Sequence, residues 1–227
     1  MDERPLIETV AAGIAHEVRN PLNALQINVR ILEQELADWI PDREAHVYSV
    51  LAKITSELQS LDNFVADFLR FARPPQLKIE QVHVRYLLSD LATFMAPECG
   101  KKGVKLLLSL EKGPIVISAD SFQLKHAVLN LVLNALQATP EGGTITIETE
   151  QEGAKLAILV RDTGEGILSD MIDRVFDLFF TMREGGTGLG LPITRRIVEE
   201  HGGSLSLASQ PGEGTTARIL LPARGEA

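Results

Sequence analysis

The sequence predicts an α+β protein with two parts. The first part is an antiparallel helical hairpin that would form a four-helix bundle on dimerisation, and the second is an α/β sandwich in which helices cover a mixed sheet. Apolar residues up to Ala72 recur at alternating gaps of four and three, which is the spacing of helices packed along a seam. After residue 76 the period changes to the alternation typical of strands, with amphipathic helices and glycine-rich turns between them.

One histidine of the first helix lies outside the apolar seam of that helix. The seam consists of Val18, Leu22, Leu25, Val29, Leu32 and Leu36. His16 and Asn20 fall outside it, one turn apart on the solvated face. Pro21 then removes an intrahelical hydrogen bond, at a cost of about 3 kcal/mol, and predicts a kink. Taken alone, His16 is best explained as a solvated surface histidine beside an incidental proline, and only the rest of the chain gives it another role.

The second helix carries the most regular apolar pattern of the sequence. Its seam consists of Val47, Leu51, Ile54, Leu58, Leu61, Val65, Phe68 and Ala72. The short connection 39–43 predicts that the two helices return antiparallel. Because two helices alone bury little apolar surface, we expect the hairpin to complete its core in a homodimer. The alternative, in which the hairpin packs on its own C-terminal domain, stays open.

A proline pair marks the end of the helical part. Arg73-Pro74-Pro75-Gln76 ends the second helix and stiffens the exit, since proline cannot continue a helix. The sequence thus predicts a domain 1–73, a linker 74–76 and a domain 77–227. In the last of these we expect helices at 87–95, 120–138 (with Asp120 as N-cap) and 191–201, and strands at 77–79, 104–110, 115–117, 144–147, 156–160, 204–207 and 215–220.

Composition limits the classes of partner and compartment. The 227 residues carry a net charge of -9 without a clustered Lys/Arg stripe, which argues against nucleic acid as a partner. Cys99 is the only cysteine, so a reducing compartment is expected, by default the cytoplasm, and its helical surroundings predict a core position. No run of about 18 apolar residues suggests a membrane span. His16 lies so close to Met1 that no sensory domain fits upstream, and the chain is expected to be a fragment or to receive its signal from a partner.

Two polar patterns of the second domain predict a ligand site. Asn130 and Asn134 share one face of an otherwise apolar helix, although a pair of surface amides would explain them equally. The segment 162–166, Asp-Thr-Gly-Glu-Gly, directly follows a buried strand, so a carboxylate stands at the end of the sheet beside glycines that allow close approach of a ligand. A tight surface turn is the alternative for this segment.

A third pattern, the glycine-rich segment 185–190, opens a helix. Its backbone amides and the helix dipole would form an anion site. The segment does not follow a strand of a βαβ unit, so it is no dinucleotide fingerprint, and the chain contains no P-loop pattern. A glycine-rich loop alone is weak support for any function.

Together and in this order, these motifs resemble those of the sensor histidine kinases of two-component signalling, and within them a nitrogen-regulator-like subgroup. Five segments carry the resemblance, which covers nearly the whole chain. Residues 16–22 are similar to the phosphoacceptor motif, 130–135 to the N box, 162–166 to the first glycine box, 175–180 to the F box and 186–190 to the second glycine box.

The resemblance implies an ATP site with Mg²⁺. Asp162 should accept a hydrogen bond from the adenine amino group, and Asn134, with Asn130, should hold Mg²⁺. The segment from about 168 to 185 would be a mobile lid anchored by three phenylalanines and contributing Arg183 to phosphate binding. Gln137 stands where a lysine is often found, which puts a phosphate contact there in doubt. The remaining nucleotide-binding positions are Gly164, Gly166, Gly186, Thr187, Gly188, Leu189 and Gly190.

The resemblance also implies the reaction. His16 would be autophosphorylated from ATP, with Glu17 polarising its ring, and would pass the phosphoryl group to an aspartate of a response regulator. Asn20 would orient water for dephosphorylation of that regulator. A chaperone-type or mismatch-repair ATPase is the main alternative, but those relatives carry a water-activating glutamate where this chain has Asn130, and an amide cannot take that proton. A purely structural helical dimer would require broken glycine boxes, and none is broken.

Overall fold

A computed structural model describes residues 22–23, 25–32, 34, 44–72, 76–113, 115–182 and 187–223 of the chain. The chain divides into two compact units. One comprises Met1–Pro75 with Arg183–Leu189, and the other comprises Gln76–Met182 with Gly190–Ala227. The predicted α+β class is confirmed, because the first unit is helical and the second combines helices with a mixed sheet.

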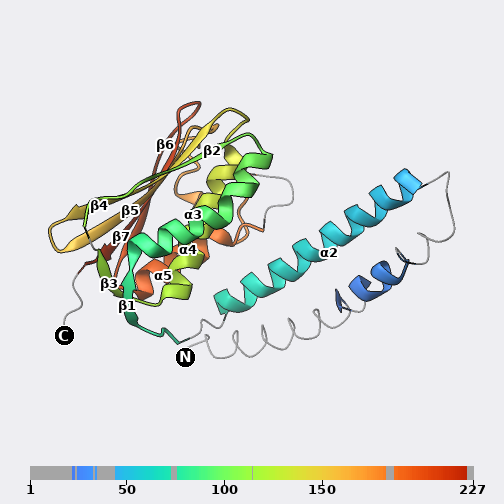
Figure 1. Cartoon of the computed structure of the whole chain (residues 1–227), viewed down its shortest axis with the longest axis horizontal. Coiled ribbons are helices and arrows are strands. Elements are labelled where there is room, and N and C mark those ends of the chain that lie inside the picture. Colours follow the sequence, from blue (N-terminus) through green and yellow to red (C-terminus); the bar gives the residue numbers. More distant parts are fainter. Residues whose placement is uncertain are drawn as a thin grey trace. The chain divides into compact units, whose positions relative to one another are not determined.

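In the helical unit, α2 (Glu44–Ala72) lies beside the described part of the preceding helix (Figure 1). Leu22, Leu58 and Val65 form a buried cluster against which Val29 and Leu69 pack. A second set of seam residues stays 41–50% exposed on the same helices. This exposed row consists of Leu25, Leu32, Ile54 and Leu61. The hairpin therefore buries about every second seam residue and leaves the other row without cover in the single chain.

In its described residues the second unit contains two sheets and three α-helices. Its strands are β1 (Glu80–His83), β2 (Lys105–Ser109), β3 (Val116–Ala119), β4 (Thr144–Glu152), β5 (Lys155–Asp162), β6 (Ser204–Gln210) and β7 (Gly214–Pro222). Its helices are α3 (Val84–Lys101), α4 (Ser121–Ala138) and α5 (Gly190–Glu200), with the short 3₁₀ helix η1 (Arg174–Phe176). The main sheet has the order β2-β4-β5-β7-β6, and β1 pairs antiparallel with β3 in a separate ribbon. Among the described strands of the main sheet, β2 pairs parallel with β4, and the other pairings are antiparallel.

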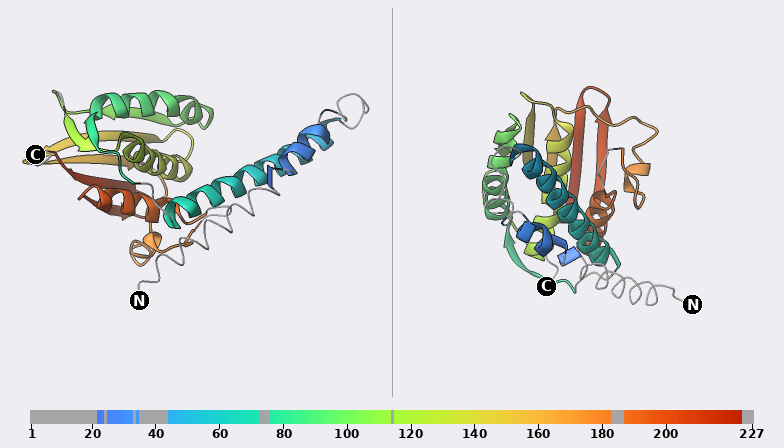
Figure 2. Two further views of the ribbon diagram at one scale, coloured as in Figure 1. Left: turned by 90° about the horizontal axis from the view of Figure 1, so that it is seen from below. Right: turned by 90° about the vertical axis from the view of Figure 1, so that its right-hand side faces the viewer.

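One face of the main sheet is apolar, and the other combines charged side chains with the buried Ala157 and Leu159 of its central strand. Ile147, Ile158 and Ile219 share one face of the sheet by their register and are fully buried. The helices cover one face of the sheet (Figures 1 and 2). The opposite face carries cross-strand ion pairs, among them Arg161 Nε to Glu148 Oε2 at 2.8 Å. A two-layer α/β sandwich follows, as predicted, because β4 and most of β7 alternate in burial and place their apolar side chains on one face, while the central strand β5 is buried over residues 156–160.

The structure corrects two predicted element boundaries. A strand was expected at 77–79, but β1 begins at Glu80, and Ile79 is 54% exposed. The helix expected at 87–95 extends over Val84–Lys101 and continues through Pro97. Cys99, near its end, is 1% exposed, as expected for a core residue, and burial raises the pKa of its thiol.

Candidate functional site

The two asparagines of α4 lie next to the first residue of α5. Asp120 caps the start of α4, because its carboxylate accepts the backbone N–H of Gln123 at 2.9 Å. The apolar stripe of α4 then faces the core, so Asn130 and Asn134 are half-buried beside it. The Asn130 side chain donates to the Gly190 carbonyl at 3.5 Å, and the Asn134 amide nitrogen lies 3.9 Å from the position of a Cβ on Gly190. The predicted pair therefore faces a helix N-terminus rather than open solvent.

The carboxylate of Asp162 is held in a fixed orientation at the end of β5. Its Oδ1 accepts the backbone N–H of Gly164 at 2.8 Å and that of Thr215 at 3.2 Å. A Cβ on Gly164 would stand 2.7 Å from the carbonyl oxygen of Ala138, at the end of α4. The Asp162 segment thus approaches α4 so closely that only glycine fits at position 164.

Two further glycines make close approaches around the same segment. Gly166 has φ 73°, and a Cβ there would stand 2.1 Å from the Gln210 carbonyl oxygen. Gly214 has φ 93°, and its Cβ would stand 1.9 Å from the carbonyl oxygen of Asp162. Sequence reasoning predicted Gly166 but missed Gly214 and its neighbour Thr215. The Gly-Glu-Gly repeat at 212–214, which matches the spacing at 164–166, was the signal that could have found them.

The described part of the second glycine segment leads into α5. Gly188 has φ 65°, a left-handed conformation that favours glycine, and Leu189 is fully buried. Thr194 donates its hydroxyl proton to the Gly190 carbonyl at 2.8 Å, within the first turn of α5. The first backbone N–H groups of a helix have no intrahelical partner, so this end of α5 suits an anion.

The aromatic segment between the two glycine segments is attached to α5. Within it, η1 contributes Val175, which is 7% exposed, and Phe176. The guanidinium of Arg195, on α5, lies 3.5 Å from the centroid of the Phe176 ring. A second such contact, at 4.4 Å, joins Arg174 and the Phe180 ring inside the segment. The contact between Arg174 and Phe180 therefore stabilises the segment internally, and the contact between Arg195 and Phe176 holds it against α5.

Several predicted site residues cannot be placed. His16, Glu17 and Asn20 lie outside the described residues, as do Arg183 and Gly186. The structure therefore brings together the predicted residues on α4, β5 and the start of α5, and leaves the roles of the others as predictions.

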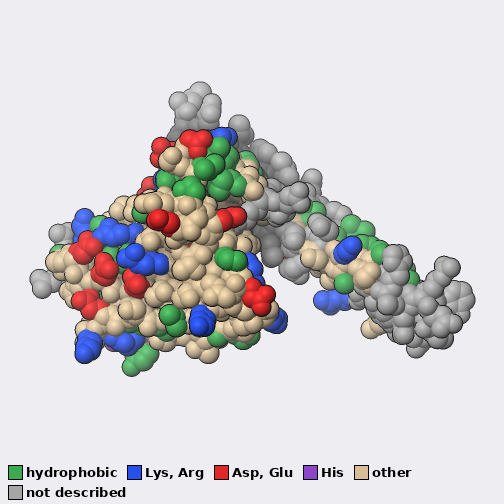
Figure 3. All heavy atoms as spheres, turned by 90° about the horizontal axis from the view of Figure 1, so that it is seen from above, with side chains coloured by type: hydrophobic (Ala, Val, Ile, Leu, Met, Phe, Trp, Pro, Cys, Tyr) green, Lys and Arg blue, Asp and Glu red, His purple; other side chains and the backbone are tan. Residues whose placement is uncertain are grey.

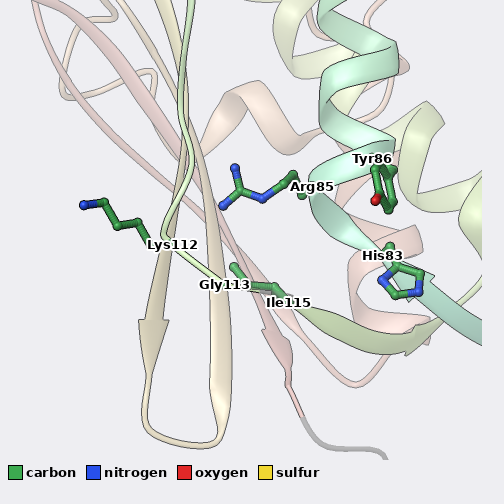
Figure 4. Close-up of a pocket in the computed structure, with 6 residues that line it drawn as sticks. All are labelled: His83, Arg85, Tyr86, Lys112, Gly113 and Ile115. Atoms are coloured by element: carbon green, nitrogen blue, oxygen red, sulfur yellow. The ribbon is translucent and has the colours of Figure 1, made fainter.

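A separate pocket of about 460 Å³ lies between the start of α3 and the connection from β2 to β3 (Figure 4). It is lined by His83, Arg85, Tyr86, Lys112, Gly113 and Ile115. In Figure 4 the Lys112 side chain points away from His83 and Tyr86, so the basic groups do not converge on one ligand position. None of the predicted site residues that the structure describes lines this pocket.

In the part of the chain that the structure describes, few features indicate a metal site or a membrane span. Among those residues no group of three or more His, Cys, Asp or Glu side chains could hold a metal ion. A cation at this site would have to be bound by amide oxygens. The side-chain nitrogen of Asn130 donates to the Gly190 carbonyl, which leaves the side-chain oxygen of Asn130 to bind the cation. No described helix has the length and hydropathy needed to cross a bilayer. On the face shown in Figure 3, Lys and Arg side chains are interspersed with Asp and Glu.

Comparison with known proteins gives the family. Residues 7–76 match the His Kinase A (phospho-acceptor) domain, and residues 119–225 match the histidine kinase-, DNA gyrase B- and HSP90-like ATPase family. The chain belongs to the two-component histidine kinases. Both histidine-kinase domains are thus present in the order that the sequence motifs predicted.

Individual relatives agree with this assignment. The chain is 35% identical over 215 residues to the sensor histidine kinase ZraS of Escherichia coli K12, covering 94% of this chain and 45% of ZraS. Its fold matches full-length ShkA, solved in complex with AMPPNP, with a TM-score of 0.81 and 26% identity over 94% of this chain and 45% of ShkA. It also matches histidine kinase ThkA, solved in complex with the response regulator protein TrrA, with a TM-score of 0.71 and 25% identity over 95% of this chain and 61% of ThkA. The chain spans less than half the length of ZraS.

Proposed function

We propose that this chain is the catalytic core of an ATP-dependent histidine kinase, with its nucleotide site formed where α4, the end of β5 and the start of α5 meet. One observation carries the proposal: Asn130 and Asn134 both face Gly190 at the N-terminus of α5. Amide oxygens beside a helix N-terminus suit a magnesium-bound polyphosphate, because the helix end attracts anions and Mg²⁺ prefers oxygen ligands. When bound there, Mg²⁺ would neutralise charge on the phosphates.

Each predicted nucleotide-binding residue has a role in this proposal. The oriented Asp162 carboxylate would accept the adenine amino proton, which selects ATP over GTP. Gly164 and Gly166 would hold the Asp162 segment beside the base, because the absence of side chains lets it pack against the carbonyls of Ala138 and Gln210. Backbone amides of the second glycine segment, at Gly186, Thr187, Gly188, Leu189 and Gly190, would contact the phosphates, together with Arg183 from the lid. The AMPPNP complex of ShkA supports a nucleotide at such a fold.

The proposed reaction moves the terminal phosphoryl group of ATP to His16. A neutral imidazole nitrogen attacks phosphorus, an N–P bond forms, and the P–O bond to the leaving ADP breaks. Glu17 would polarise the ring. The phosphoryl group would then pass to an aspartate of a response regulator, and Asn20 would orient water for its later removal. The ThkA complex with TrrA supports a response regulator as partner.

We also propose that the active form is a homodimer. The exposed row Leu25, Leu32, Ile54 and Leu61 supports this, since a second hairpin could cover it in a four-helix bundle. The remaining sequence predictions stay proposals: domains 1–73 and 77–227 with linker 74–76, a nitrogen-regulator-like subgroup, a cytoplasmic location, and no nucleic-acid partner.

Labelled ATP tests the proposed reaction. Incubation with Mg²⁺ should label the wild-type chain but not a His16→Gln variant, and the product should be labile in acid and stable in base, as a phosphoramidate is. Omission of Mg²⁺ should abolish the label. Label that persists in His16→Gln, or that survives acid, would refute the assignment of His16.

A further inference from the structure

The buried carboxylate of Asp120 connects segments that are far apart in the sequence. Its side chain is 7% exposed, and besides capping α4 through Gln123 it accepts the backbone N–H of Lys78 at 2.8 Å. Burial alone would raise the pKa of this carboxyl, but the backbone N–H donors of Gln123 and Lys78 act in the opposite direction, and on balance the pKa is lowered. Asp120 is thus a fixed acceptor for the segment that enters this unit.

The backbone of Asp120 also contacts the residue that follows α5. Its N–H donates to Nε2 of His201 at 2.9 Å, so Nε2 carries no proton. The other ring nitrogen, Nδ1, lies 2.7 Å from the carbonyl oxygen of Ile197, which can only accept, so Nδ1 carries the proton. In this arrangement both ring nitrogens of His201 are hydrogen-bonded, and the side chain joins the start of α4 to the end of α5.

These contacts lie at the opposite end of the helix pair from the proposed nucleotide site. The helices α4 and α5 run antiparallel, since His201 at the end of α5 meets Asp120 at the start of α4, while Gly190 at the start of α5 meets Asn130 further along α4. The pair is therefore tied by a hydrogen bond near each end. A change in the Asp120–His201 contact alters how α4 and α5 lie against each other, and so alters the groups that face the nucleotide.

Lys78 extends this connection to the chain that leaves the helical hairpin. It lies two residues after Gln76, where the second unit begins, and its backbone N–H is bound to Asp120 before β1 starts at Glu80. A displacement of this entering segment must therefore either break the bond to Asp120 or move the start of α4.

We propose that Asp120 and His201 are positioning residues that couple the segment at Lys78 to the nucleotide affinity of α4 and α5. This inference rests on the proposed nucleotide site and adds a route for its regulation. Because coupling between two sites is reciprocal, nucleotide binding must in turn strengthen the hydrogen bond from Lys78 to Asp120.

Two substitutions of His201 separate its two hydrogen bonds. Gln reaches the position of Nε2 and keeps an acceptor for the Asp120 N–H, whereas Asn reaches only the position of Nδ1 and loses that acceptor. By calorimetry of the full chain with AMPPNP and Mg²⁺, His201→Asn should bind at least about fivefold more weakly than wild type, and His201→Gln within about twofold. Glu200→Gln, which removes the neighbouring ion pair to Arg196, is the control and should bind as wild type does.

Hydrogen exchange of the Lys78 amide supplies the second measurement. In wild type, AMPPNP should slow this exchange by at least about fivefold. Asp120→Ser keeps a helix cap, but its shorter side chain cannot reach the Lys78 N–H. In this variant AMPPNP should no longer slow exchange of the Lys78 amide, and AMPPNP should bind more weakly than to wild type. This measurement tests the coupling even if His201→Asn does not fold.

Three results would overturn the inference, and they differ in what else they refute. If wild type binds AMPPNP but its Lys78 exchange does not change, or Asp120→Ser binds as tightly as wild type, the coupling is wrong while the nucleotide site stands. If wild type does not bind AMPPNP, the proposed function fails and the coupling fails with it.

Discussion

At the scale of single residues, Asp162 allows a substitution that changes ligand chemistry while keeping the fold. Asn keeps an Oδ1 that can accept from Gly164 and Thr215, but places an NH₂ donor where the second carboxylate oxygen was. That NH₂ donor would face the amino group of adenine, which is also a donor, so no hydrogen bond could form between them. We therefore expect Asp162→Asn to weaken AMPPNP binding by tenfold or more, about 1.4 kcal/mol, with an unchanged far-UV spectrum and melting temperature. Calorimetry showing affinity near wild type would mean that the base binds elsewhere.

Gly214 and Gly212 form a matched pair that tests the close approach to Asp162. Both have positive φ, 93° and 79°, but a Cβ on Gly214 would collide with the Asp162 carbonyl oxygen at 1.9 Å, whereas a Cβ on Gly212 would meet nothing within 4 Å. Gly212→Ala should cost only the left-handed strain, about 1–2 kcal/mol. Gly214→Ala should cost clearly more, because the backbone at Asp162 must move. Urea unfolding measures both, and equal losses would contradict the geometry.

Sequence reasoning at this scale succeeded where a residue acts locally and failed where tertiary contacts define its role. Asp120 was predicted as an N-cap, because a cap needs only the residues that follow it. Its bonds to Lys78 and His201 could not be predicted, since they join positions 42 and 81 residues away. For Gly214 the Gly-Glu-Gly repeat was a visible signal, but the contact that excludes a side chain there could not be predicted, because the oxygen belongs to another strand.

At the scale of elements, the contact between Arg195 and Phe176 should control opening of the aromatic segment. Cation–π contacts contribute about 0.5–2 kcal/mol, depending on how far they are desolvated. Arg195→Ala should therefore raise hydrogen exchange across 167–182, while Arg196→Ala, which changes the next residue of the same helix, should not. Arg195→Lys should give an intermediate result, since an ammonium keeps the charge but loses the stacking plane. Identical exchange in Arg195→Ala and wild type would show that other contacts hold η1.

The elements themselves were largely predictable, but their pairing was not. The apolar periods of α2 and α4 and the alternation of β4 and β7 follow from the sequence because burial on one face imposes them, and the continuous apolar run of β5 follows from burial on both faces. The parallel pairing of β2 with β4 was not predicted, since it depends on how β3 and α4 cross between them. The start of β1 was misjudged because its partner β3 sets the register, with Glu80 opposite Ala119.

At the scale of the whole molecule, the exposed row on the hairpin predicts association. Leu25, Leu32, Ile54 and Leu61 are each 41–50% exposed, and such a row on two adjacent helices is costly in water. In the homodimer that we propose, these side chains would pack against their counterparts on a second chain. The alternative, packing of the hairpin on its own C-terminal domain, predicts a monomer, so the state of association in solution separates the two.

A charged substitution in the exposed row tests the dimer directly. Leu61→Glu places a carboxylate in the proposed interface without removing a member of the buried Leu22, Leu58 and Val65 cluster, so the hairpin should keep its helicity. Sedimentation equilibrium of the full chain at micromolar concentration should show a dimer for wild type and a monomer for Leu61→Glu. Lys53→Glu changes the charge on an exposed part of the same helix outside the seam and should stay dimeric. A wild-type monomer, or a dimer that tolerates Leu61→Glu, would rule out association through this row.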